Sequence, residues 1–236
     1  ATLSEVFDYL ASRKMRIAIA LDEFQQITQF PEKGVEALLR SLVQRVPGVG
    51  FVFAGSRQHI MREMFSSASR PFFQSTQKMH LDVIARDSYL SFARKWFEAD
   101  GRTLADETFD SVYRRFDGIT WYVQAVLNRL YSRRVGDPSA ADVDDVVRQL
   151  VGESVYDYRA LVEALPEASV RLLRAIAVEG VAREVTSASF VSRHGLKAPS
   201  TTAEALDRLV KKELVYKAED GYVIYDRLFG LWLRSW

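Results

Sequence analysis

Two adjacent acids directly follow an apolar run near the start of the chain. The run is Ile17–Leu21, and Asp22 and Glu23 come immediately after it. Ligands of open α/β sheets bind at the carboxyl ends of the strands. There the first acid can help to hold Mg²⁺, which keeps much of its water shell, and the second can act as a general base toward water. An ordinary strand-to-loop junction with two solvated acids gives the same pattern.

A serine follows a second apolar run at the same relative place. The run Gly50–Ala54 leads into Gly55 and Ser56. Unbroken apolar runs of this length predict strands that are buried on both faces of a parallel sheet. In a parallel neighbour of the first strand, the Ser56 hydroxyl would lie beside the two acids and could bind the attacking water or a γ-phosphate. The alternative is a serine that caps the next turn. The two strand ends together favour a nucleoside triphosphatase.

The surrounding elements predict an α/β core at the front of the chain. Apolar residues at helical spacing predict helices over Leu3–Ser12, Val35–Arg45 and His59–Phe65. Residues Lys78–Leu81 are expected to form a third strand. The order strand–helix–strand, with polar residues at the strand ends, indicates parallel topology.

From Arg86 to about residue 150 the pattern is helical throughout, and we expect four helices forming a lid. The first carries a stripe of aromatic residues at helical spacing: Tyr89, Phe92, Trp96 and Phe97. Such a stripe could be a stacking platform, but helical spacing favours packing in the core of the lid.

The last eighty residues have the pattern of a winged helix. Four helices are expected between residues 155 and 212, and two short alternating runs flank Asp220-Gly221, a strong hairpin signal. A final helix is expected from Arg227. Residues 155–236 contain 12 Lys and Arg against 11 Asp and Glu. DNA binding usually needs a basic surface, so protein interaction or packing against the lid is the favoured use of this domain, and DNA binding is the alternative.

Four blocks of the sequence resemble the archaeal and bacterial ATPase family related to AAA+ and STAND ATPases. They are Leu21-Asp22-Glu23-Phe24-Gln25, Phe53-Ala54-Gly55-Ser56, Phe65 with Arg70-Pro71-Phe72-Phe73, and Gly118-Ile119-Thr120-Trp121-Tyr122-Val123-Gln124. The resemblance implies that Asp22 and Glu23 are the Walker B acids, with Asp22 the Mg²⁺ ligand. It also implies that Ser56 is the sensor 1 residue and that ATP is the cofactor.

The resemblance gives two further site predictions. Arg70 is a candidate arginine finger, which would stabilise charge on a neighbouring subunit's nucleotide, although a solvated loop arginine is an equal alternative. Gly118 and Thr120 belong to a lid turn that binds the nucleotide in relatives. The family often has Gly-x-Pro there, and the absence of the proline weakens the expected contact with the base.

The front of the chain departs from the family. The phosphate-binding pattern G-x-x-x-x-G-K-[ST] does not occur, and only 21 residues precede Asp22. In the family's sheet order the first strand lies between the strands expected at Gly50–Ala54 and Lys78–Leu81. We therefore expect a gap in the sheet, and we interpret the chain as the later part of a longer protein. On its own it is expected to be inactive, because the backbone N–H groups and lysine that hold phosphates are missing.

Composition limits the alternatives. The net charge of +1 provides no global attraction to nucleic acid or membranes, and no cysteine is available for disulfides or thiol chemistry. We expect a cytoplasmic α/β protein with three parts: a partial parallel-sheet P-loop ATPase core (1–84), a helical lid (85–154) and a winged-helix domain (155–236). Its expected function is regulatory ATP hydrolysis with Mg²⁺. The alternative is a winged-helix regulator with a vestigial core, and a protein partner or self-association is expected in either case.

Overall fold

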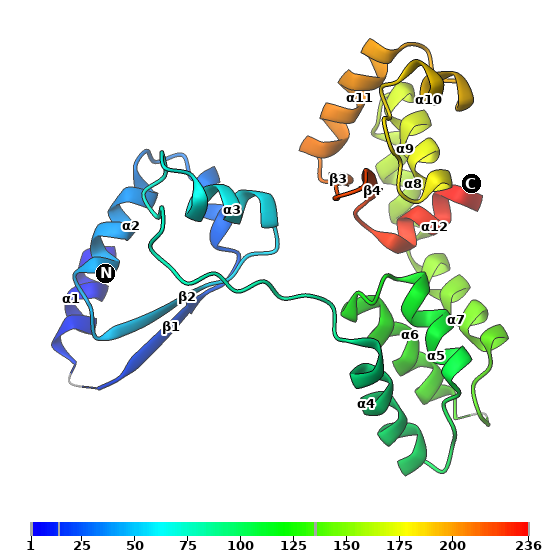
Figure 1. Cartoon of the computed structure of the whole chain (residues 1–236), viewed down its shortest axis with the longest axis horizontal. Coiled ribbons are helices and arrows are strands. Elements are labelled where there is room, and N and C mark those ends of the chain that lie inside the picture. Colours follow the sequence, from blue (N-terminus) through cyan, green and yellow to red (C-terminus); the bar gives the residue numbers. More distant parts are fainter. Residues whose placement is uncertain (1, 14, 135, 236) are drawn as a thin grey trace. The chain divides into compact units, whose positions relative to one another are not determined.

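The computed structural model describes residues 2–13, 15–134 and 136–235. They belong to two compact units, Ala1–Leu81 and Asp82–Trp236, which are described separately (Figure 1). Among the described residues, every helix is too short or too polar to cross a bilayer.

The first unit alternates helices and strands. Its elements are α1 (Leu3–Ser12), β1 (Ile17–Leu21), the 3₁₀ helix η1 (Phe24–Gln29), α2 (Val35–Gln44), β2 (Val49–Phe53) and α3 (Gln58–Ser66). Helix α1 begins at Thr2, whose hydroxyl accepts from the Glu5 N–H while the Glu5 carboxylate accepts from the Thr2 N–H. This reciprocal cap satisfies two otherwise unpaired donors. The three helices and two strands confirm the expected order, whereas η1 was not expected.

The two strands form a parallel sheet, with Ile17 opposite Val49 and Leu21 opposite Phe53. Exposure alternates along both strands, and Ala18, Ala20, Gly50 and Val52 are exposed. Helices α1, α2 and α3 lie on one face of the sheet only (Figure 1). The prediction that both faces are buried is therefore wrong for this unit, because no described element of the first unit covers the second face.

The predicted third strand at Lys78–Leu81 is also wrong, since these residues form no strand. The side chains of Met79 and Leu81 are 83% and 82% exposed. A strand persists only when a neighbour accepts and donates its backbone hydrogen bonds. Within the described residues of the first unit, the sheet contains only β1 and β2, so this segment has no strand beside it.

Aromatic rings fill the core of the first unit. Phe24, Phe53, Phe65 and Phe72 pack together, with ring centroids between 4.4 and 5.9 Å apart. Phe7 of α1 stacks on Phe51 of β2 at 5.8 Å. Because each ring buries a large apolar area, the covered face of this small sheet is well packed.

The second unit begins with four lid helices: α4 (Arg86–Ala99), α5 (Asp106–Arg115), α6 (Thr120–Arg133) and α7 (Ala140–Glu153). They confirm the four helices expected. Tyr89 and Phe97 of α4 are buried, but Phe92 and Trp96 are 52% and 57% exposed. Core packing was therefore the right interpretation for the first pair and the wrong one for the second. The four positions span too wide an arc of the helix for one core to cover.

A winged helix follows, and its layout is as the sequence predicts. Its elements are α8 (Val155–Glu163), α9 (Glu167–Glu179), α10 (Ala188–Arg193), α11 (Pro199–Lys211), β3 (Val215–Lys217), β4 (Tyr222–Ile224) and α12 (Arg227–Ser235). Strands β3 and β4 are antiparallel, and Ala182 adds a bridge to Tyr222. One continuous hydrophobic cluster runs through the lid and the winged helix.

Candidate functional site

The carboxyl ends of β1 and β2 are tied together by backbone hydrogen bonds. The Ala54 N–H donates to the Leu21 carbonyl and the Phe24 N–H donates to the Ala54 carbonyl, both at 2.9 Å. Parallel pairing thus continues one step past each strand. Because of this, the loop that carries Asp22 and Glu23 lies directly beside the loop that carries Gly55 and Ser56, as the sequence predicts.

Glu23 and Ser56 are in direct contact. The Ser56 hydroxyl donates to Oε2 of Glu23 at 3.1 Å. Glu23 has φ of 48°, in the left-handed region. That conformation costs free energy for a residue with a side chain and is found at functional sites more often than elsewhere. The strained turn at Glu23 directs its carboxylate toward the end of the neighbouring strand.

Asp22 lies next to this pair and is exposed. Its Oδ1 accepts a hydrogen bond from the Glu23 N–H at 2.9 Å. The site therefore offers two carboxylates and one hydroxyl, all oxygen donors. Mg²⁺ suits such a set, because it is usually held by one or two carboxylates together with water and phosphate oxygens. No group of three or more His, Cys, Asp and Glu side chains in the described parts of the chain could hold a metal ion.

A third side chain, Gln25, completes the group and was not predicted as a site residue. Gln25 is fully buried, and its amide Nε2 donates to Oε2 of Glu23 and lies 3.5 Å from the Ser56 hydroxyl. Its amide oxygen is buried without a hydrogen-bond partner. The sequence contained a weak signal, since Gln25 directly follows the apolar residue Phe24, and an amide that is buried beside such a residue needs a hydrogen-bond partner.

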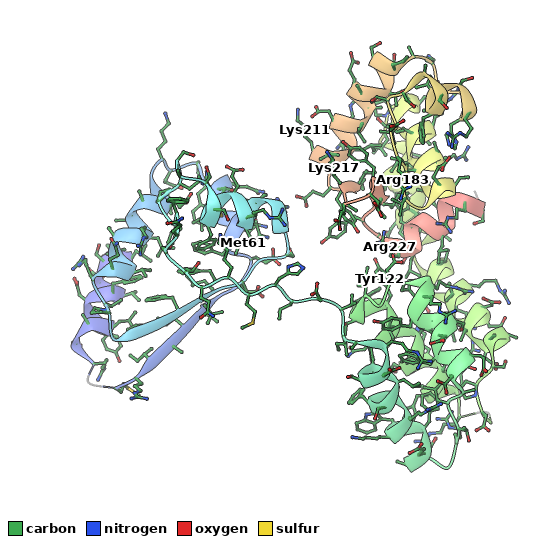
Figure 2. All side chains as sticks on the ribbon, in the orientation of Figure 1. Met61, Tyr122, Arg183, Lys211, Lys217 and Arg227 are labelled. Atoms are coloured by element: carbon green, nitrogen blue, oxygen red, sulfur yellow. The ribbon has the colours of Figure 1, made fainter. Side chains whose placement is uncertain are left out.

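Gly55 makes room for this arrangement. A Cβ at Gly55 would lie 2.3 Å from Oε1 of Gln25 and 2.6 Å from Sδ of Met61; Met61 is labelled in Figure 2. Such distances are far inside van der Waals contact. A side chain at position 55 would therefore force the ends of the Gln25 and Met61 side chains to move.

Arg70 lies in the loop after α3 and is ion-paired within the first unit. Its Nη2 lies 2.7 Å from Oε2 of Glu36, and its Nη1 lies 3.7 Å from Oε1 of Glu63. The arginine side chain is 25% exposed and that of Glu36 is 13% exposed. Burial raises the pKa of Glu36, and the charge of Arg70 partly offsets this rise. To serve as an arginine finger, Arg70 would have to leave Glu36, so that role stays a prediction.

Gly118 and Thr120 belong to the second unit. Gly118 has φ of 69° and is buried against the ring of Tyr113, where a Cβ would come within 2.7 Å of Cζ. Only glycine fits this turn without strain. Thr120 is the first residue of α6 and is partly exposed. The turn thus has a structural reason for its glycine, and nucleotide binding by Gly118 and Thr120 stays a prediction.

The winged helix is hydrogen-bonded to the lid next to this turn. The Asp226 carboxylate accepts from the hydroxyls of Tyr122 in α6 and Tyr158 in α8, each at 3.2 Å. It also caps α12 by accepting from two backbone N–H groups at 2.8 and 3.2 Å. The Arg227 N–H donates to the Tyr122 hydroxyl at 3.0 Å, and its guanidinium lies 3.0 Å from the Asp117 carboxylate. Tyr122 and Arg227 are labelled in Figure 2.

Comparison with known proteins agrees with this architecture. Residues 156–235 match the family model described as a probable winged helix domain. The Walker-type ATPase of Pyrococcus abyssi superposes with a TM-score of 0.65 and 18% identity, covering 99% of this chain and 68% of that one. A search of curated proteins found no match.

Two further solved structures are more distant. The RuvB Holliday junction branch migration motor of Thermotoga maritima gives a TM-score of 0.48 at 15% identity, over 98% of this chain and 75% of that one. The ORC2 protein of Aeropyrum pernix gives 0.44 at 14% identity, over 99% and 69%. Of these three likenesses, that to the Pyrococcus protein is strong enough to bear on the fold, and it covers 99% of this chain. The chain therefore has the fold of a prokaryotic P-loop ATPase with a small parallel sheet, a helical segment and a C-terminal winged helix, which confirms the fold and the likeness expected from the sequence.

Proposed function

We propose that this chain is the part of a regulatory, ATP-hydrolysing P-loop ATPase that follows the phosphate-binding loop. The observation that carries the proposal is the contact between Glu23 and Ser56 at the adjoining ends of two parallel strands, 3.1 Å apart. In this proposal residues 1–84 are the ATPase core, 85–154 the lid and 155–236 the winged-helix domain, in a cytoplasmic protein.

Each polar group at the strand ends has a distinct part in the proposed reaction. Asp22 would hold Mg²⁺, mostly through water, and the ion would neutralise charge on the phosphate oxygens. Glu23 would accept a proton from the attacking water. No described residue donates to its Oε1, and the side chain is exposed. Ser56 would orient the same water or contact the γ-phosphate through its hydroxyl.

The open edge of β2 offers a pairing site for the strand that the proposed ATPase core lacks in this chain. The Leu21 carbonyl accepts from the Ala54 N–H, and backbone groups alternate sides along a strand. The N–H and C=O groups of Phe51 and Phe53 therefore point away from β1. A strand that leads into a phosphate-binding loop would pair there and would lie beside the segment at 78–81. This is the sheet order that the family resemblance implies.

ATP turnover tests the proposal. We would measure ATP binding and hydrolysis by the longest natural version of the protein beside this 236-residue chain. We expect only the longer version to bind and hydrolyse ATP. Its Glu23→Gln variant should bind ATP but lose at least about 100-fold in kcat, since general-base catalysis contributes roughly that much or more.

Glu32→Gln is the matched control, because it makes the same chemical change at a glutamate that is exposed in the loop after η1. Equal turnover by wild type and Glu23→Gln would refute the assignment of Glu23. If neither version hydrolyses ATP, the core is a scaffold and the winged helix becomes the functional part.

A second candidate is a protein-interaction regulator that uses the winged helix. Helix α11 exposes Glu204 and Asp207, and Lys211 is paired with Asp207 at 2.8 Å. These acids would oppose phosphates on the face where a winged helix usually contacts DNA. On the wing, Tyr216 and Tyr225 are exposed and pack edge-to-face at 5.9 Å. Exposed tyrosines are common in protein interfaces.

Two binding assays separate the uses of the winged helix. Gel retardation of the full chain at low salt should show no retained duplex, whereas retention that weakens with salt would indicate DNA binding. Replacing Tyr216 and Tyr225 with serine should abolish capture of a protein partner or self-association. Unchanged association by this variant would remove the wing from the interface.

A further inference from the structure

We propose that Gln25 is a positioning residue that holds the Glu23 carboxylate and the Ser56 hydroxyl as one hydrogen-bonded group, and that Gly55 is the residue that allows it. This inference deepens the proposed function and rests on it, since it concerns the same site. We base it on the hydrogen bonds of Gln25, on the complete burial of its side chain and on the close packing at Gly55.

Two donors converge on one oxygen of Glu23. The Gln25 amide and the Ser56 hydroxyl both donate to Oε2. A carboxylate oxygen can accept two such bonds, and together they fix the rotation of the group. The other oxygen, Oε1, keeps its lone pairs available. Because Glu23 is exposed and Gln25 is fully buried, the buried amide gives a flexible surface carboxylate a fixed direction.

The orientation of the Gln25 amide follows from its partners. If the amide were rotated by half a turn, its oxygen would face Oε2 of Glu23, and two acceptors would oppose each other. The nitrogen therefore faces Glu23 and Ser56. In this orientation Oε1 is buried without a partner. Leaving a buried acceptor unpaired is unfavourable, so the arrangement is not the one that stability alone would select.

Gly55 fixes where that amide can lie. A Cβ there would come within 2.3 Å of Oε1 of Gln25 and 2.8 Å of Cγ of Met61. An alanine would have to push both side chains aside. The glycine of the Gly55-Ser56 pair thus acts on Glu23 through Gln25, while the serine contacts Glu23 directly.

The first test is spectroscopic and uses the full 236-residue chain without nucleotide. The side-chain amide signals of Gln25, assigned by loss in Gln25→Leu, should be shifted from those of exposed glutamines and should exchange slowly with water. Glu23→Ala and Gly55→Ala should each move them toward the exposed values. The proposal would be overturned if the Gln25 signals matched those of Gln26 and did not move in Glu23→Ala.

The second test uses the longer natural version that hydrolyses ATP. Gln25→Leu should lower kcat by about 10-fold to 100-fold, the usual cost of removing a group that orients a reacting residue. The KM for ATP should change by less than about 3-fold, because the substrate is not contacted. Gly55→Ala should reproduce this pattern, and Gln26→Leu, an exposed neighbour, should have no effect.

The outcomes separate this inference from the proposed function. If Glu23→Gln abolishes turnover while Gln25→Leu leaves kcat unchanged, Glu23 acts without Gln25 and only the inference fails. If Glu23→Gln has no effect on turnover, the proposed function fails. Thermal unfolding of each variant checks that it is folded, and equal loss of kcat and of folded protein would contradict a positioning role.

Discussion

Asp226 is expected to be one of the most sensitive positions of the second unit. It accepts from the hydroxyls of Tyr122 and Tyr158 at 3.2 Å each and from the N–H groups of Leu228 and Phe229 at 2.8 and 3.2 Å. One carboxylate therefore joins the lid helix α6, the first winged-helix element α8 and the start of α12. Replacing it with alanine removes all four bonds and leaves two partly buried hydroxyls without an acceptor.

The magnitude follows from the individual bonds. Loss of a helix cap costs about 1 kcal/mol, and each hydroxyl bond contributes about 1 kcal/mol. Asp226→Ala is therefore expected to destabilise the second unit by about 3 kcal/mol. For a unit of this size, that corresponds to a fall in Tm of about 6–12 °C.

Urea and thermal unfolding of the full chain, followed by circular dichroism, measure this loss. Asp220→Ala is the control, because the Asp220 side chain is 72% exposed and only 3.6 Å from Arg183. It should cost less than about 0.5 kcal/mol. A loss of less than about 1 kcal/mol in Asp226→Ala would refute the reasoning. Separate transitions for lid and winged helix in the variant would support Asp226 as their link.

Three further predictions concern the titration of a buried tyrosine, the hydrogen bonding of a buried arginine and the loop arginine Arg70. Burial raises the pKa of Tyr122 from 10.0 to about 12, so the contribution of Tyr122 to stability should be complete below pH 10.0 and be lost as pH rises through about 12. Tyr122→Phe should reduce this dependence in unfolding measured against pH, and the rest should remain because burial also raises the pKa of Tyr89 and of Tyr158. The Arg102 side chain is 8% exposed and donates to the carbonyl of Tyr131 at 2.7 Å. Changing Arg102 to methionine should lower the free energy of unfolding by about 3 kcal/mol. A decrease of less than about 1 kcal/mol in urea unfolding would contradict this prediction. Arg70→Met should raise the pKa of Glu36 further, because the charge of Arg70 lowers that pKa in the wild type. An NMR titration of the Glu36 carboxyl group measures the change, and an unchanged pKa would show that the two side chains do not form an ion pair. In the ATP-hydrolysing version, a loss of about 1000-fold or more in kcat with the same variant would identify Arg70 as a finger.

The element order was predictable because local patterns decide it. Helical spacing, the Asp220-Gly221 turn and the glycine and proline breaks indicate helices and hairpin without tertiary information. Burial on both faces of β1 and a strand at Lys78–Leu81 were not predictable in this way. Both depend on neighbouring chain that must cover a face or pair with an edge, and no described element does so.

The candidate site was predictable only in part. Parallel pairing follows from the strand pattern, and it brings Ser56 to Glu23. The role of Gln25 depends on side-chain packing around Gly55, which no periodicity encodes. The left-handed turn at Glu23 is likewise a tertiary property. The roles of Asp22 and the other site residues in nucleotide chemistry stay predictions.

The uncovered edge of β2 also has a consequence for handling the protein. The segment Val49–Phe53 contains no charge and no proline, and its backbone groups on one side lack a partner strand in the described part of the chain. Such an edge is a template for strand addition by a second copy, which is how many proteins begin to aggregate. At high concentration this chain is therefore prone to edge-to-edge association through Phe51 and Phe53, and a charged substitution at the exposed Val52 would act as a gatekeeper against it.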